Sequence, residues 1–251
     1  MAAGAVEVNI TSPNAKPSAL FDGVNNYINI GNVFVYGYSV CLWFKTSAAA
    51  NGNLVGFTTF SAHEHMEVSV RNDGRILVMQ DSNNFMYSTV AGYNDGAWHH
   101  VYVNYAYDAS VNVKIYVDGV DVSGGISSSI DTPNAIANFR IGSGWVGTVQ
   151  PFNGSIGEVR IWNRALTATE VNKLYGGEVS RTGLVSEWLL KDDYTDTAGS
   201  NDGTNSGTRL GTFDGPIAKV IAADRVTAND RYMIVPSAGG RQVITTVVEE
   251  T

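Results

Sequence analysis

The chain is poor in cysteine, histidine, proline and charged side chains. Its 251 residues include one cysteine, four histidines and six prolines, and 16% of them are charged. A single cysteine excludes an internal disulfide framework. Because Cys41 lies in the strand-like segment YSVCLWFKT, we expect a buried, unreactive thiol. No segment approaches the 18 consecutive apolar residues of a membrane-spanning helix, and we expect no secretory signal peptide in residues 1–20.

Basic surface is also scarce. The formal net charge is -8, and residues 209–251 contain as many basic as acidic side chains, so the whole excess lies in residues 1–208. An acidic domain repels phosphate backbones, and no basic stripe with interspersed aromatic residues is present. Nucleic acid is therefore excluded as the expected partner.

The chain is instead rich in glycine and in short β-branched or aromatic runs, which is typical of many strands joined by tight turns. Asp73-Gly74 and Asp118-Gly119 each predict a hairpin turn with positive φ. Asp118 and Asp121 could also suggest a metal pair, but the hairpin accounts for both. The expected strands are Tyr27–Ile30, Tyr38–Lys45, Leu54–Phe60, Met66–Val70, Arg75–Gln80, Met86–Val90, His99–Tyr107, Asn112–Val117, Phe139–Gly142, Ile156–Trp162 and Leu184–Leu190.

A single short helix is expected directly after a strand, in the segment Phe152–Tyr175. Thr167 and Glu170 have the spacing of a capping box, in which each side chain accepts from the other residue's amide. Val171 and Leu174 supply an apolar face, and Gly176-Gly177 predicts the end of the helix. Strands without alternating helices exclude a parallel sheet.

Catalytic patterns are not evident. Glycoside hydrolases need paired carboxylates, and neither Glu64/Glu67 nor Glu158 has a partner at a useful spacing. His63 and His65 could bind a transition metal from one strand face, but no third ligand is visible, which favours a polar loop cluster. Of His99 and His100, we expect one to form a hydrogen bond inside the fold.

Several segments in a fixed order resemble the laminin G-like, concanavalin A-like lectin superfamily. They are ALFDGVNNYINIG, YSVCLWFKT, DGAWHHVYVNY, KIYVDGVDV and FRIGSG, followed by the strand and helix above. The resemblance implies an all-β fold, an antiparallel two-sheet jelly-roll sandwich, here with one short helix and a small C-terminal β extension.

The resemblance also suggests a domain organisation. Residues 1–18 would form an N-terminal arm, 19–208 the sandwich, and 209–251 a β-rich attachment or oligomerisation segment. The segment Gly183–Thr208 resembles the start of such domains; it is either a closing strand of the same sandwich or the relic of a second repeat, and we favour the closing strand.

Calcium is the metal that the resemblance suggests, because relatives hold a hard cation near the rim of the sandwich. Gly157, Asn25 and Asn26 stand where relatives often place acidic residues, which weakens this expectation. The remaining oxygen donors are Asp22, Asn26 and Glu158. No other cofactor is expected.

Sugars are recognised by aromatic rings flanked by amides and carboxylates, since a pyranose has an apolar face and a polar rim. Loops with this chemistry contain the predicted ligand-binding residues Trp145, Tyr93, Asn94, Asn83, Asn84, Phe85 and Tyr87. Trp145 is the strongest candidate, with capping of the core as the alternative.

The sequence therefore predicts a non-catalytic recognition or display module. We expect a phage or virus particle surface protein that binds a glycan or host surface and contacts other virion proteins through its C-terminal segment, as a homo-oligomer. A secreted bacterial carbohydrate-binding or adhesion module is the first alternative. A glycoside hydrolase of the same fold is the second.

Overall fold

The computed structural model describes residues 16–33, 38–56, 67–79, 84–105, 113–127, 139–144, 150–212, 231–236 and 242–247. Lys16–Thr212 form one compact unit, and the hairpin of β17 (Arg231–Pro236) and β18 (Gln242–Val247) belongs to a second. The sandwich thus extends from Lys16 to Thr212, slightly beyond the expected bounds of 19 and 208.

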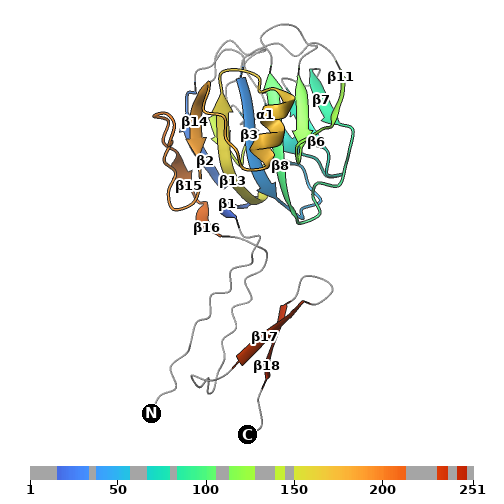
Figure 1. The fold of residues 1–251 in the computed structure, drawn as a ribbon, viewed down its shortest axis with the longest axis vertical. Coiled ribbons are helices and arrows are strands. Elements are labelled where there is room, and N and C mark those ends of the chain that lie inside the picture. The colour runs from blue at the N-terminus through green and yellow to red at the C-terminus, as the bar shows by residue number, and fades with distance from the viewer. Residues whose placement is uncertain are drawn as a thin grey trace. The chain divides into compact units, whose positions relative to one another are not determined.

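Two antiparallel sheets of eight strands each make up the described part of the sandwich, which confirms the expected fold class. Sheet A has the order β10 (Val120–Asp121), β9 (Lys114–Val117), β8 (Trp98–Tyr105), β3 (Tyr38–Lys45), β13 (Asn153–Trp162), β1 (Pro17–Asp22) and β16 (Arg209–Thr212), and β14 (Leu184–Trp188) also pairs with β13. Figure 1 shows β13 and β3 side by side within this sheet.

Sheet B has the order β11 (Ser123–Ile126), β7 (Phe85–Ser88), β6 (Ile76–Met79), β5 (Glu67–Val70), β4 (Gly52–Gly56), β12 (Phe139–Ile141), β2 (Tyr27–Gly31) and β15 (Thr204–Ser206). Every strand expected from its pattern overlaps an observed strand. The sandwich strands absent from the expected set are β1, which has six residues, and β10, β11, β15 and β16. These last four have four residues or fewer, too short to display an alternation.

The core lies between the two sheets and follows the two-residue alternation of the strands. Val68 and Val70 of β5, Ile76 and Val78 of β6, and Ile28 of β2 are at most 2% exposed and belong to one apolar cluster. Alternate positions consequently point away from the core. Away from the bulges, this alternation assigns the strand residues of sheet B to an inner or an outer face.

Both expected hairpins are confirmed. Asp118 and Gly119 have φ of 52° and 80° between the paired strands β9 and β10, the two positive values of a type I′ turn. Gly74, with φ of 79°, turns the chain from β5 into β6.

The segment after the helix closes the same sandwich, as expected. β14 pairs with β13 in sheet A, β15 pairs with β2 in sheet B, and β16 pairs with β1. β14 and β1 lie on the same side of β13, one beyond the other, and a bulge in β13 separates them. Glu158 occupies this bulge with φ of 50°.

Helix α1 (Ala168–Tyr175) has the predicted capping box, with Thr167 as the N-cap. At its other end Gly177 has φ of 94°, and the Glu178 amide donates to the Lys173 carbonyl, as in a Schellman motif. Figure 1 shows α1 lying across the face of sheet A, in front of β3 and β8. The helix buries Val171 and Leu174 against Cys41, Tyr102 and Trp162.

Candidate functional site

The outer face of sheet B carries a polar cluster where a packed surface would carry apolar residues. The strand register places residues of neighbouring strands opposite one another, and these residues form two rows that run across the outer face. One row is Tyr87, Leu77, Ser69 and Asn53, and the other is Phe85, Met79, Glu67, Gly56, Arg140, Asn29 and Thr204. We call Asn53, Glu67, Ser69 and Arg140 the outer-face cluster.

The centre of this cluster is buried. Asn53 and Ser69 are 0% exposed and Glu67 is 4% exposed. Gly144 lies against it so closely that a Cβ there would be 1.9 Å from the Asn53 Nδ2 atom and 3.0 Å from the Glu67 Oε2 atom. Between Glu67 and Arg140 the row contains Gly56, which has no side chain to fill the interval.

Several polar atoms of the cluster form no hydrogen bond of good geometry among the described residues, although the Asn53 amide and the Ser69 hydroxyl lie close enough to the Glu67 carboxyl group to lower its pKa. They are Nδ2 and Oδ1 of Asn53, Oγ of Ser69 and Nε of Arg140, together with Oε1 of the nearby Gln150. A buried polar group without a partner costs about 1–3 kcal/mol, and folded proteins contain few of them. This concentration of such groups marks the outer-face cluster as the candidate site.

Glu67 is the one carboxylate of the cluster. Burial raises its pKa to about 7, although the neighbouring Ser69 hydroxyl, the Arg71 charge and the Asn53 amide oppose the rise. Near neutral pH the carboxyl group is therefore partly protonated and can both donate and accept hydrogen bonds. The two described rows contain no second carboxylate, whereas a retaining glycosidase places one about 5 Å from the first.

Aromatic rings lie at both ends of the rows. At one end Phe85 and Tyr87 contact each other edge to face, with centroids 5.4 Å apart, and the Arg75 guanidinium lies 4.6 Å from the Tyr87 centroid. At the other end the Arg140 guanidinium lies 4.1 Å from the Tyr27 centroid. These rings are half-buried, so each retains a face or edge that a sugar can contact.

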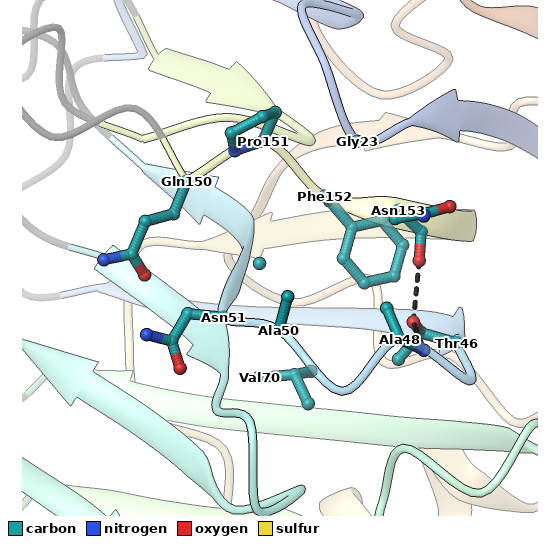
Figure 2. Close-up of a pocket in the computed structure, with 11 residues that line it drawn as sticks. Gly23, Thr46, Ala48, Ala50, Asn51, Val70, Gln150, Pro151, Phe152 and Asn153 are labelled. Atoms are coloured by element: carbon teal, nitrogen blue, oxygen red, sulfur yellow. Dashed lines mark hydrogen bonds between the residues drawn. The ribbon is translucent and has the colours of Figure 1, made fainter.

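A separate pocket of about 370 Å³ lies at the rim of the sandwich (Figure 2). Its lining contains no charged side chain and includes Thr46, Asn51, Gln150, Phe152 and Asn153. The Thr46 hydroxyl already donates to the Asn153 carbonyl, and the Asn51 side chain accepts from the Asn72 amide. The pocket therefore offers a ligand fewer unsatisfied groups than the outer-face cluster does.

The structure brings together some of the predicted ligand residues. Phe85 and Tyr87 share the outer face of sheet B, and Asn84 directly precedes them. Tyr93 and Asn94 lie in the loop before β8, where Tyr93 packs against His99 and Asn94 donates to the carbonyls of Ala48 and Asn72. The Asn94 side-chain amide is therefore engaged in hydrogen bonds between loops and is not free to bind a ligand. Asn83 and Trp145 lie outside the described residues.

The three predicted metal ligands are not brought together. Asp22 lies at the end of β1 opposite Asn153, whereas Glu158 follows Gly157, which contacts Pro17 at the other end of the same strand. Five residues of strand span roughly 16 Å. Asp22 instead accepts the amides of Val24, Asn25 and Asn26, and Glu158 accepts from Arg160.

Within the described ranges no group of three or more His, Cys, Asp or Glu side chains could hold a metal ion. The close approach of Pro17 explains why residue 157 is glycine, since a Cβ there would be 2.5 Å from the Pro17 carbonyl oxygen.

The remaining candidates have structural roles. Cys41 is 1% exposed and burial raises its pKa to about 12, so the thiol is unreactive as expected. His99 Nδ1 lies 2.8 Å from Asp118 Oδ2, which confirms a histidine hydrogen bond within the sandwich. Asp118 also accepts the His100 amide, so the hairpin interpretation holds. His63 and His65 lie outside the described residues.

Sequence reasoning missed Asn53, Ser69 and Arg140. The available signal was the alternation in EVSV and FRI, which places Glu67, Ser69 and Arg140 opposite the core once the strands are known. Asn53 could not be placed in this way, because a bulge between Asn53 and Val55 interrupts the alternation of β4.

Residues 22–172 match the family model of the concanavalin A-like lectin/glucanases superfamily. The chain belongs to this superfamily. No curated protein matches it significantly. Within the described part of the chain, no helix has the length and apolar character required to cross a membrane.

Solved structures with the same fold are distant in sequence. A Bacteroides ovatus protein described as a candidate carbohydrate-binding protein has 21% identity and a TM-score of 0.59, over 82% of this chain and 62% of its own. This chain thus spans about three fifths of that protein. A heptameric pentraxin from Limulus polyphemus has 16% identity and a TM-score of 0.55, over 80% of this chain and 97% of its own. These similarities concern the fold alone.

Proposed function

We propose that this protein binds a glycan at the outer face of sheet B and does not cleave it. The observation that carries the proposal is the set of buried, unpartnered polar atoms on Asn53, Ser69 and Arg140 beside half-buried aromatic rings. Sugar hydroxyl groups both donate and accept, so they can satisfy amide, hydroxyl and guanidinium groups together. The apolar face of a pyranose suits Tyr27, Phe85 or Tyr87.

A glycan array followed by isothermal titration calorimetry tests this proposal. The Asn53→Ala variant should bind a hit at least tenfold more weakly, because it removes two hydrogen-bonding atoms at the centre of the face. Tyr87→Ala should also weaken binding. Tyr175→Ala is the matched control, since Tyr175 stacks on Trp43 on the opposite side of the sandwich, and it should bind as the unmodified protein does. Equal binding by all three variants would refute the location.

The absence of cleavage is tested separately. Incubation with each glycan that binds should release no reducing sugar over hours at pH 5 to 8. Release that disappears in Glu67→Gln would favour the glycoside hydrolase alternative, with Glu67 as its acid.

We also propose display on a phage or virus particle, with the chain after Thr212 as the attachment segment, because Arg209–Thr212 form β16 of the sandwich. Assignment of the β17–β18 hairpin to a compact unit separate from Lys16–Thr212 supports this division of roles. Light scattering should give an oligomer for the full chain and a monomer for a chain ending at Thr212. A monomer in both cases would favour a secreted carbohydrate-binding module.

A further inference from the structure

Arg140 differs from the other deeply placed arginine of the sandwich. Arg160 is 6% exposed and its guanidinium pairs with Glu187 at 2.7 Å and with Glu158 at 3.2 Å. Arg140 forms no ion pair with any described residue, and its Nε atom is buried without a partner. Arg140 as a whole is half-buried, and an unpaired guanidinium group at such a position can pair with an anion from outside the chain.

The geometry of Arg140 leaves its hydrogen-bonding edge available. The guanidinium carbon of Arg140 lies over the Tyr27 ring, 4.1 Å from its centroid, in a cation–π contact. Its N–H groups lie in the plane of the group. Nε is buried, so the two terminal Nη groups form the fork that matches the two oxygens of a carboxylate.

The surroundings favour an anion, although the whole chain has a net charge of -8. Arg71 follows Glu67 and Ser69 at two-residue spacing, so it adds a second positive charge at the same face, and this charge acts on Glu67. Arg75 is neutralised by Asp73 at 2.7 Å. Glu67, with its pKa raised by burial to about 7, opposes an anion only in part at neutral pH.

We propose that the glycan bound at the outer face of sheet B is acidic, and that its carboxylate pairs with Arg140. This inference rests on the proposed function. The Tyr27 ring lies beside the Arg140 guanidinium and is half-buried, so it can contact the sugar ring that carries the carboxylate. Arg140 fixes the orientation of the saccharide, and the neutral groups bind the rest of it.

Matched saccharides test the inference on the full chain. Calorimetry would compare 3′-sialyllactose with lactose and with 3′-sulfolactose, and trigalacturonate with its methyl ester, after an array of neutral, carboxylated and sulfated glycans. A carboxylated glycan should bind at least tenfold more tightly than its neutral counterpart. Arg140→Gln should abolish this preference, and Arg140→Lys should keep only part of it because an ammonium group lacks the fork.

Arg209→Gln is the control, because Arg209 is exposed on β16 of sheet A and its loss changes the net charge equally. Circular dichroism and thermal unfolding would establish that each variant is folded, and Arg140→Lys retains the test if Arg140→Gln does not fold. Neutral glycans bound as tightly as acidic ones, a preference for sulfate alone, or an unchanged preference in folded Arg140 variants would overturn the inference while leaving glycan binding intact. An array without any bound glycan would overturn the proposed function itself.

Discussion

The outer faces of sheet A and sheet B contain similar residue types, but the surroundings of their buried polar groups differ. On sheet A, Tyr102 and Trp162 are 0% exposed beneath helix α1, and their polar atoms are satisfied. The Tyr102 hydroxyl accepts from the Leu166 amide, and Trp162 Nε1 donates to the Ser180 carbonyl. On sheet B, the buried Asn53 amide and Ser69 hydroxyl have no partner among the described residues. Sheet A also contains buried polar atoms without a partner among the described residues, Trp98 Nε1 and His100 Nδ1 of β8. The two faces therefore differ chiefly in their cover, because helix α1 packs on sheet A.

The difference has an energetic origin. A closed face gains from apolar burial and from satisfied hydrogen bonds. An open face retains the desolvation cost of its unpartnered groups until a ligand satisfies them. Substitutions on sheet A should therefore lower stability, and substitutions in the outer-face cluster should lower binding and leave stability unchanged or raised.

The largest effect is expected for Trp162→Ala. Removal of this fully buried ring beneath α1 should destabilise the fold by about 4 kcal/mol, since it leaves a cavity and an unpartnered Ser180 carbonyl. Urea unfolding followed by circular dichroism measures the change. A loss below about 1 kcal/mol would mean that the helix does not seal this face.

The second prediction concerns pH and Glu67. The folded-state pKa of about 7 exceeds the ordinary value of 4.5, so the folded protein holds a proton that the unfolded chain releases between these pH values. The Glu67 contribution to stability is therefore unchanged below pH 4.5, falls as the pH rises to about 7, and is lowest above it. The total fall is on the order of 3 kcal/mol.

The Glu67→Gln variant should remove this dependence. It should be more stable than the unmodified protein at pH 8 and nearly equal to it at pH 4.5, as measured by urea unfolding at both values. Glu158→Gln offers a comparison, because Glu158 lies outside the outer-face cluster. If the difference in the free energy of unfolding between Glu67→Gln and the unmodified protein were the same at both pH values, the pKa of Glu67 would be ordinary.

A smaller effect is expected at the cap of α1. Thr167→Ala removes the acceptor for the Glu170 amide, at 3.3 Å, and should cost about 1 kcal/mol. Thr169→Ala, at an exposed position in the same helix, is the control and should change stability by less than about 0.5 kcal/mol. Equal effects of the two substitutions would indicate that the capping box contributes little.

The smallest effect on stability is expected for Phe85→Ala on sheet B. Phe85 is half-buried and contacts Tyr87 edge to face, so its loss should cost no more than about 1 kcal/mol. Glycan affinity should nevertheless fall several-fold. A stability loss comparable to that of Trp162→Ala would remove the distinction between the two faces.

Much of the fold was predictable because its signals are local. The Asp118-Gly119 turn and the Thr167 capping box depend on residues within a few positions of each other, and their geometry follows from backbone sterics. The short strands β15 and β16 were not predictable, because pairing with β2 and β1 supplies their conformation. The predicted metal site of Asp22 and Glu158 does not form, because the length of β1 separates the two residues.

By itself, the sequence determined the antiparallel β architecture, the capped helix and the inert character of Cys41. These features follow from the alternation of apolar and polar residues, from the turn and capping residues, and from the apolar neighbours of Cys41, all of which are local in the sequence. Only the tertiary structure decided which outward residues gather in the outer-face cluster. Asn53, Glu67, Ser69 and Arg140 come from three strands whose order in sheet B differs from their order in the chain. The pairing of distant strands brings them together, and the helix covers the other sheet.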